Sequence, residues 1–222
     1  MPSTVVHVGL AGLLGVALLG DRFDAKAILV VLAATAALDL DTLIGMGWTG
    51  THRAALHNLF VVAVPAALLY WDVRRREESI VRARFGVDAP RVLWVTLACL
   101  LVAHIMLDAF FNGVNLFWPL HDQFYDLSGK LYLSNHDGFV QTFVEFTTAD
   151  DGSQTVSEST AAGTTETTHY ETGFDPGPDP EPDPERIFPI AYNGERFVVA
   201  LAGYLAVSVR LWEERRSNTA DH

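Results

Sequence analysis

The sequence predicts an all-α integral membrane protein, a polytopic bundle of about five transmembrane helices with a disordered acidic external loop. Half of the 222 residues are hydrophobic and only 19% are charged, a composition that excludes disorder for most of the chain. The net charge of −12 lies almost wholly in residues 112–195, which carry 15 acidic and two basic residues. Five apolar stretches make up much of the remainder, and they run over residues 5–19, 27–44, 56–71, 92–111 and 197–212.

The length and polarity of these stretches favour a membrane bundle. A membrane-spanning helix needs about 20 mostly apolar residues, in a range of about 17–25. Residues 92–111 meet this length, and residues 27–44 are long enough but contain Asp39 and Asp41 near their end. The other three are slightly short, so a soluble bundle of very apolar helices is the alternative. Few polar faces separate the stretches, however, as is typical of helices that face lipid. The first stretch lacks a preceding positive charge and a small-residue cleavage pattern, so we expect it to be retained rather than removed as a signal peptide.

Basic residues predict how the bundle is oriented. Six arginines lie between Arg74 and Arg91, and three more lie between Arg210 and Arg216. Because cytoplasmic loops are enriched in lysine and arginine, both segments should be cytoplasmic. Five spans of the cell membrane then place the N-terminus and residues 112–195 outside the cell, and the C-terminus in the cytoplasm.

The external segment divides into two parts. Phe139, Val140 and Phe143 recur at helical spacing after Asp137, a residue suited to an N-cap, which predicts an amphipathic helix at the interface near residues 137–146. Threonine, serine, proline and acidic residues then dominate, a composition that predicts disorder. The expected domains are a membrane bundle (1–146), a disordered acidic loop (147–185) and a last helix with a cytoplasmic tail (186–222).

Composition also limits the chemistry. The chain lacks the basic surface that nucleic-acid binding requires, so we expect no nucleic-acid partner. The single Cys99 excludes an intrachain disulfide and a cysteine-based zinc site. Acidic residues are frequent and lysine is scarce, a balance that a high-salt, halophilic setting favours.

Several ionisable residues lie inside the apolar stretches, where a charge is costly and needs a reason. His104 and Asp108 are four residues apart, which places both side chains on one helix face. They can bind a metal ion there, or form a His–Asp hydrogen bond that ties helices together. Asp39 lies deeper in its stretch than Asp41, for which an ordinary interfacial carboxylate is an equal alternative.

Three more histidines lie at the ends of apolar stretches. His52 and His57 precede the third stretch and His7 begins the first; each, taken alone, could be a surface or core histidine. Arg53 is suited to hold an anionic group such as a phosphate. The orientation predicted from the arginines places all the histidines and aspartates named above at the same external face of the membrane. Nitrogen and oxygen ligands suit Zn²⁺, or Mn²⁺, at a hydrolytic site.

The order of these residues resembles a known family, the membrane-bound metal-dependent hydrolases typified by YdjM. The resemblance covers about residues 1–125 and rests on His7 in a first apolar helix, Leu38-Asp39-Leu40-Asp41, His52-Arg53 with His57-Asn58, His104-x-x-x-Asp108, Gly113, and Phe117-Trp118-Pro119-Leu120. The ligand order is also similar to the zinc phospholipase C and P1 nuclease fold, an all-helical bundle. This similarity implies a zinc cluster and a phosphoester substrate.

These observations together predict a metal-dependent hydrolase at the external membrane face, acting on a phosphoester or related bond of a lipid-linked or interfacial substrate. The expected partners are the lipid bilayer and that substrate, and the expected cofactor is a divalent metal, Zn²⁺ or else Mn²⁺. Arg53 would neutralise the phosphate, and His121 would protonate the leaving group unless it is an ordinary loop histidine. The alternative is a non-enzymatic membrane scaffold or metal-binding protein with a structural polar cluster. The expected metal ligands are His7, Asp39, Asp41, His52, His57, His104 and Asp108.

Overall fold

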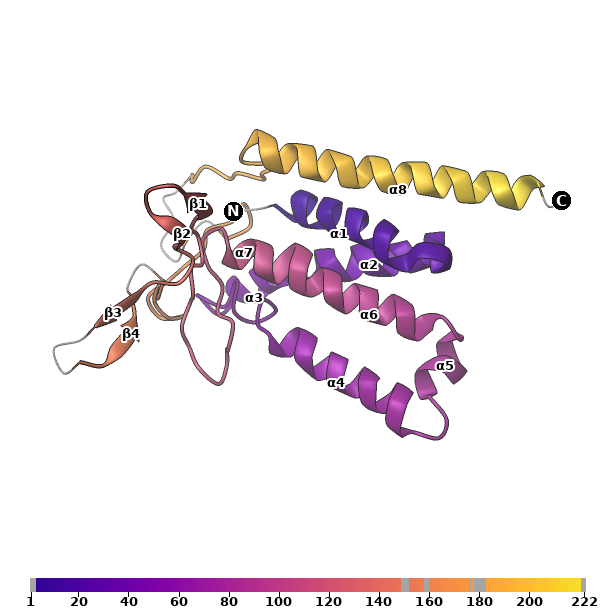
Figure 1. Ribbon diagram of the computed structural model, residues 1–222, viewed down its shortest axis with the longest axis horizontal. Coiled ribbons are helices and arrows are strands. Elements are labelled where there is room, and N and C mark those ends of the chain that lie inside the picture. The colour runs from indigo at the N-terminus through magenta and orange to yellow at the C-terminus, as the bar shows by residue number, and fades with distance from the viewer. Residues whose placement is uncertain (1–2, 149–151, 158–159, 176, 178–182, 221–222) are drawn as a thin grey trace. The chain divides into compact units, whose positions relative to one another are not determined.

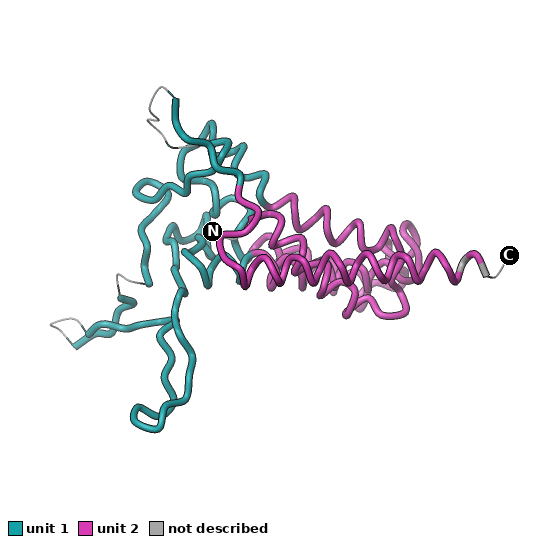
Figure 2. The backbone as a smooth tube through the Cα atoms, turned by 90° about the horizontal axis from the view of Figure 1, so that it is seen from above, with its two compact units in different colours: residues 1, 39–59, 105–188 teal, residues 2–38, 60–104, 189–222 magenta. Residues whose placement is uncertain are grey.

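The computed structural model (Figure 1) consists of two compact units, which Figure 2 distinguishes by colour. Unit 1 contains residues 1, 39–59 and 105–188, and unit 2 contains residues 2–38, 60–104 and 189–222. The structure describes residues 3–148, 152–157, 160–175, 177 and 183–220.

Unit 2 is a bundle of long helices. Along this bundle α1, α4 and α8 run in one direction, and α2 and α6 run in the other (Figure 1). Ser3 caps α1 and Asp24 caps α2, each side chain accepting hydrogen bonds from backbone N–H groups of the first turn, the usual chemistry of a helix start. The helices are α1 (Thr4–Leu19), α2 (Ala25–Ala37), α4 (Phe60–Arg75), the short α5 (Ile80–Phe85), α6 (Ala89–Cys99) and α8 (Gly194–Ala220). A π-helical stretch (Leu100–Met106) continues α6.

The core of unit 2 is apolar and built mainly from α1, α2 and α6. One buried cluster contains Ala11, Leu19, Phe23, Ala27, Ile28, Val31, Val95, Cys99, Ala103 and Val207. Most of these side chains are small or β-branched, so the helix axes can lie close together. The side chains then pack closely against one another instead of contacting solvent or lipid.

Glycine brings α1 and α8 into backbone contact. A Cβ atom added to Gly9 would lie 2.6 Å from the Ala200 Cα, and one added to Gly203 would lie 1.7 Å from the Gly9 carbonyl oxygen. No side chain fits at either position. Small residues are the usual means by which membrane helices approach one another, so the last helix belongs firmly to this bundle.

Three helical runs among the described residues are long and apolar enough to cross a membrane: Thr4–Arg22, Ala25–Gly45 and Ala89–Ala109. The expectation of five spans is therefore wrong on this measure. The 16-residue α4 contains Pro65 and ends in arginines, which leaves it short of the roughly 20 apolar residues that a span needs. The 27-residue α8 is long enough, but charged residues such as Glu195 and Arg210 shorten its apolar part.

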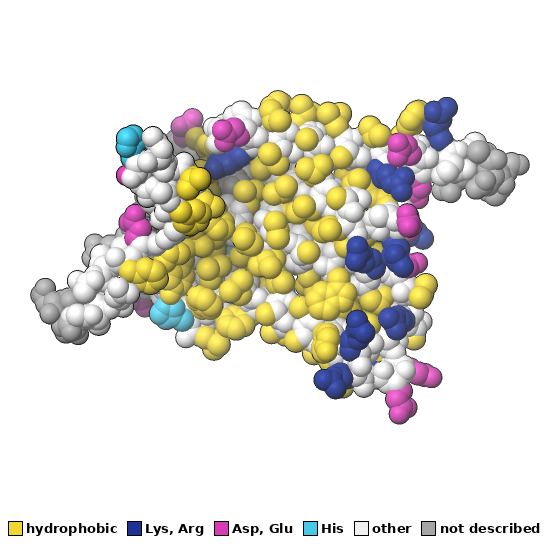
Figure 3. Space-filling view, viewed as in Figure 1, with side chains coloured by type: hydrophobic (Ala, Val, Ile, Leu, Met, Phe, Trp, Pro, Cys, Tyr) yellow, Lys and Arg dark blue, Asp and Glu magenta, His cyan; other side chains and the backbone are white. Residues whose placement is uncertain are grey.

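The outer surface of unit 2 has an apolar face and a basic end (Figure 3). Hydrophobic side chains cover the visible face of its helices, and lysine and arginine gather where α4 ends and α6 begins. Leu68, Trp71, Leu205 and Val209 are among the large exposed hydrophobic residues. An apolar surface of this extent is typical of a face that contacts lipid.

Unit 1 combines short helices with two small hairpins. The short helices are α3 (Asp41–Gly45) and α7 (Leu107–Ala109), and a 3-10 turn (Leu38–Leu40) leads into α3. Strand β1 (Leu131–Ser134) pairs antiparallel with β2 (Gly138–Gln141), with Leu131 opposite Gln141. Strand β3 (Phe146–Thr148) pairs antiparallel with β4 (Gln154–Val156). The protein is therefore mostly helical rather than all-α.

The helix expected near residues 137–146 is wrong, because residues 138–141 form strand β2, residue 146 begins β3 and the residues between them are not helical. Asp137 and Gly138 lie at the turn between β1 and β2, and Gly138 has a φ of +69°. The Ser134 hydroxyl accepts hydrogen bonds from the N–H groups of His136 and Asp137. An Asp-Gly pair between apolar residues is a hairpin signal, and here it outweighs the helical spacing of the aromatic residues.

Residues 160–175, which we call the strap, make specific hydrogen bonds within unit 1, and disorder over residues 147–185 stays a prediction. The Thr165 N–H and hydroxyl donate to the Asp122 carboxylate, and the Tyr170 hydroxyl donates to the Asn112 carbonyl at 2.7 Å. Composition indicated disorder because the strap has few apolar residues, but its hydroxyl groups are used in hydrogen bonds. The rest of that expectation concerns in part residues 149–151, 158–159, 176 and 178–182, which lie outside the described residues.

Candidate metal centre

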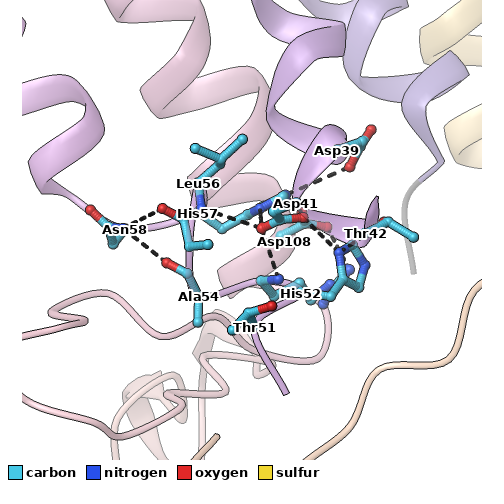
Figure 4. A network of polar contacts seen from close by, with 12 residues as sticks. Asp39, Asp41, Thr42, Thr51, His52, Ala54, Leu56, His57, Asn58 and Asp108 are labelled. Carbon is cyan, nitrogen blue, oxygen red and sulfur yellow. Dashed lines mark hydrogen bonds and ion pairs between the residues drawn. The ribbon is translucent and has the colours of Figure 1, made fainter. Parts of the chain in front are cut away.

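Asp41 occupies the centre of a buried polar network in unit 1 (Figure 4). It is the first residue of α3 and is fully buried. Its Oδ1 accepts a hydrogen bond from His52 Nδ1 at 2.8 Å, and its Oδ2 accepts one from His57 Nδ1 at 2.8 Å. The backbone N–H groups of Arg53 and Leu56 also donate to Oδ2, at 3.1 and 3.3 Å. Asp41 therefore orients both imidazole rings, as a carboxylate behind a metal-binding histidine does.

The other edge of the His57 ring faces two more carboxylates. Its Nε2 lies 3.3 Å from Asp108 Oδ2 and 3.6 Å from Asp39 Oδ1. Because Nδ1 donates to Asp41, the lone pair of the neutral ring is on Nε2. A lone pair directed at two carboxylates is repulsive unless a cation lies between them. Imidazole nitrogen and carboxylate oxygen are donors that suit Zn²⁺, so His57 and a neighbouring carboxylate fit as ligands of a metal ion.

A proton on Nε2 is the cation that would compete with a metal. Burial lowers the pKa of His57, but the Asp41 carboxylate and hydrogen bonds to Asp108 and Asp39 raise it, and the balance lies well above its usual range. The three carboxylates around one ring thus favour positive charge at this position, whichever cation supplies it.

Arg53 holds Asp108, which lies in α7, by a buried ion pair. Its Nη2 donates to Asp108 Oδ1 at 2.7 Å, and its Nη1 donates to the Asn112 side chain and to the Gly113 carbonyl. The guanidinium also lies over the Tyr170 ring, 4.8 Å from the centroid. Arg53 is 1% exposed and has a φ of +64°, a conformation that is strained for a residue with a side chain. This conformation is tolerated because the two Nη atoms are held by Asn112, Gly113 and Asp108.

Unit 2 has a histidine pair of its own, His7 and His104. The rings stack with centroids 3.8 Å apart and planes 6° apart, and both are buried. Each Nδ1 lies 2.8 Å from a backbone carbonyl oxygen, Ala103 for His7 and Thr35 for His104. Carbonyls only accept, so each ring donates from Nδ1 and has its lone pair on Nε2. Metal-binding histidines are usually fixed in this way, and a π-helical stretch such as the one holding His104 is frequent at functional sites.

The predicted site residues occur in both units. Within unit 1, His57 Nε2 lies near both Asp39 and Asp108, whereas both oxygens of Asp41 are used to orient histidines. His52 donates to Asp41 and presents its Nε2 elsewhere. The histidine pair lies within unit 2. His121 is exposed and its Nε2 lies 3.0 Å from the Tyr125 hydroxyl, so its described partner belongs to a surface loop.

Sequence reasoning missed the residues that hold Arg53. Asn112 and Tyr170 are 58 positions apart and joined by a hydrogen bond from the Tyr170 hydroxyl. The only signal for Tyr170 is an aromatic residue within an otherwise polar tract, which is unexpected in a segment that contacts nothing.

The fold and this cluster define a helical membrane protein with a buried histidine and carboxylate centre. The family model of the YdjM inner membrane protein matches residues 1–165. The chain therefore belongs to the YdjM inner membrane protein family, and it is a membrane protein. The match extends beyond the 125 residues that the motifs suggested, and so includes part of the acidic segment. No curated protein and no solved structure matches the chain.

Proposed function

We propose that this protein is a metal-dependent hydrolase that cleaves a phosphoester or related bond in a lipid-linked or interfacial substrate. The observation that carries this proposal is the position of His57 Nε2 between the Asp39 and Asp108 carboxylates, while Asp41 holds the opposite nitrogen. Zn²⁺ is the metal that we favour and Mn²⁺ is the second choice, because the donors are nitrogen and oxygen.

Each residue of the cluster has a separate task. A bound metal ion would lower the pKa of a water molecule to about 7 and polarise the phosphoryl oxygen. His57 and Asp108 would bind the ion, Asp39 lies close enough to His57 to assist as a further ligand, and Asp41 keeps His57 in the correct tautomer. The Nη atoms of Arg53 already donate to protein acceptors. We therefore assign Arg53 to positioning Asp108 rather than to binding the phosphate.

We keep His7 and His104 in the proposed ligand set because of how their rings are oriented within unit 2. Both rings have their Nδ1 fixed by a backbone carbonyl and so present Nε2 as the metal-binding nitrogen.

We propose further that the substrate is met on the external side of the membrane. The arginines of α4, α5 and α8 lie at one end of unit 2, and positive charge marks the cytoplasmic side. Because α1 runs toward that end, the N-terminus lies outside. Labelling of cysteines placed at Ser153 and Ser79 in a Cys99→Ala background tests this orientation. The cysteine at position 153 should react with a reagent added outside intact cells. Reaction of the cysteine at position 79 from outside would reverse the assignment.

The decisive experiment combines metal analysis with a hydrolysis screen. We expect the purified full chain in detergent to contain zinc or to take it up, and to hydrolyse bis-p-nitrophenyl phosphate or phospholipid vesicles. His57→Ala and Asp108→Asn should lose both metal and activity. Asp72→Asn is the matched control, because Asp72 is a buried carboxylate in unit 2 that accepts hydrogen bonds from Ser79 and Ile80. It should keep both.

The outcomes separate the enzyme from a scaffold. Wild-type protein that purifies without metal, gains no stability from Zn²⁺ or Mn²⁺ and ignores chelator would end the metal proposal. Protein that binds metal through His57 and Asp108, yet hydrolyses no phosphoester, would be a membrane metal-binding protein with a structural polar cluster.

A further inference from the structure

One end of unit 2 carries an arginine-rich segment, residues 74–91, which we call the basic turn (Figure 3). It runs from the last turn of α4 through α5 to the start of α6. It contains six arginines and three acidic residues, a local charge of +3 in a chain whose net charge is −12. Four of its arginines are exposed and form no ion pair with any described carboxylate: Arg74, Arg75, Arg82 and Arg84. Guanidinium groups left free in this way can bind an anion from outside the chain.

Large apolar side chains are exposed beside these arginines. Phe85 is 69% exposed and Val87 is 77% exposed, and the Arg84 guanidinium lies 5.9 Å from the centroid of the Phe85 ring. Trp71, one turn before the basic turn, is also exposed. Exposed apolar groups of this size mark a surface that contacts another apolar phase. A surface that is both cationic and apolar fits an anion with a hydrocarbon part better than an ion dissolved in water.

The basic turn lies where two apolar spans end. The span Thr4–Arg22 ends in Arg22, and the span Ala89–Ala109 begins directly after Asp88. Arg22 Nε donates to Asp88 Oδ1 at 2.7 Å, so these two ends are held at the same level of the bundle. Since α5 ends only three residues before Asp88, its arginines are at the border of the hydrocarbon core, which is the depth of the lipid headgroups.

We infer that the basic turn is a binding site for anionic phospholipids. Its arginines bind the phosphate groups, to which a planar guanidinium can donate two parallel hydrogen bonds. Phe85 and Val87 contact the upper part of the acyl chains. Each basic residue near an anionic membrane surface strengthens binding about fivefold, so several together select anionic over zwitterionic lipid. The site is separate from the metal centre in unit 1 and holds whether or not the protein is a hydrolase.

Lipid titration of the purified full chain tests the inference without an activity assay. In micelles of a neutral detergent, native mass spectrometry counts the lipids that each chain retains. The wild type should retain dioleoylphosphatidylglycerol with an affinity about tenfold or more above that for dioleoylphosphatidylcholine. This preference should decrease as NaCl is added, because salt screens exposed charges.

Paired arginine variants locate the site. Arg82→Gln/Arg84→Gln should lose about tenfold or more in affinity for the anionic lipid. Its melting temperature with phosphatidylcholine should stay that of the wild type, because both side chains are exposed. The matched control is Arg215→Gln/Arg216→Gln, which removes the same charge from exposed positions of α8 that follow two glutamates. It should bind the anionic lipid like the wild type.

Inorganic phosphate at matched ionic strength distinguishes a lipid site from a site for the free anion. It should displace little phosphatidylglycerol, because it cannot contact Phe85. Phe85→Gln keeps every arginine and should still weaken retention of the anionic lipid.

Equal retention of the two lipids by the wild type at low salt overturns the inference. Equal losses in the two double arginine variants also overturn it, since they would indicate an effect of overall charge. Complete displacement by phosphate, with Phe85→Gln indistinguishable from the wild type, would show a free-anion site in place of a lipid site.

Discussion

In unit 2, α1 meets α8 at Gly9 and Gly203, where no side chain fits between the backbones. In unit 1, the loop before α4 meets α7 through Arg53 and Asp108, two buried charges 2.7 Å apart. Both contacts fix neighbouring segments, but one does so by removing side chains and the other by pairing charges.

The difference follows from the backbone. A helix satisfies its own hydrogen bonds and needs only a close fit to its neighbour, so small residues suffice. The loop at residues 46–59 leaves backbone and side-chain polar groups that need partners, and Asp41 alone accepts from two of its N–H groups. Irregular backbone can therefore hold a polar centre, whereas the helices supply the support. Substitutions that interchange the two kinds of contact test this comparison.

The largest effect should come from adding volume between α1 and α8. Gly203→Val would place a Cβ 1.7 Å from the Gly9 oxygen, so the helices must separate. We expect a loss of about 3 kcal/mol or more, at or beyond the upper end of the usual cost of overpacking, measured by thermal unfolding in detergent. Gly194→Ala is the control, because a Cβ there meets nothing within 4 Å. Equal melting temperatures for both variants would contradict the close approach.

Removing one charge in unit 1 should have an effect of similar size. Arg53→Met leaves Asp108 buried without its guanidinium, which costs about 3–5 kcal/mol in typical proteins. The double variant Arg53→Met/Asp108→Asn should recover part of that loss, because no uncompensated charge remains. Urea unfolding of the four proteins gives the coupling free energy. Additive losses would show that the pair is not coupled.

A smaller effect should follow at Tyr170, which joins the strap to this pair. Tyr170→Phe removes only the hydrogen bond to the Asn112 carbonyl and should cost about 1 kcal/mol. Tyr170→Leu also removes the ring beneath Arg53 and should cost about 1 kcal/mol more. Glutamate-specific proteolysis of the strap measures both. If Phe and Leu are equivalent, the contact between guanidinium and ring contributes nothing.

The smallest effect should be a pH-dependent one at Asp122. Burial raises the pKa of this carboxyl, but hydrogen bonds from Thr165 and Asn115 lower it by more than burial raises it. The pKa of Asp122 therefore lies below the usual range. A carboxyl whose pKa is lowered on folding stabilises the folded state at pH values above its unfolded pKa of about 4. This stabilisation is lost as the pH falls through the pKa of the folded state. Asp122→Asn should therefore lower the melting temperature at pH 7 and converge with the wild type in acid. Asp137→Asn, at an exposed turn, should show no such trend.

The long helices were predictable because their signal is local. The apolar stretches at residues 5–19 and 56–71 correspond to α1 and α4, and the stretch at 92–111 to the run Ala89–Ala109. The number of spans was not, because apolar character alone did not weigh Pro65 and the arginines at the end of α4. The helix expected after Asp137 failed for a related reason, since two local signals competed and the turn prevailed.

The candidate residues could be singled out from the sequence, and the contacts between them could not. Ionisable side chains in apolar surroundings identified Asp39, His57 and Asp108, because buried charge is rare without a reason. Sequence could not show that Asp41 uses both oxygens on histidines, or that Arg53 is enclosed by Asn112, Gly113 and Tyr170. These contacts join positions far apart in the chain, and no periodicity records them.

The shortness of α4 has a consequence for the surrounding bilayer. Its 16 residues extend about 24 Å, whereas the 21 residues of the run Ala89–Ala109 extend about 31 Å, close to the thickness of a hydrocarbon core. Where α4 lies in the bilayer, its shortness would be met by local thinning of the lipid or by its flanking arginines reaching toward the headgroups. Headgroups would sink toward the membrane centre along this side of unit 2, so the protein would shape the depth at which lipid headgroups are presented around it.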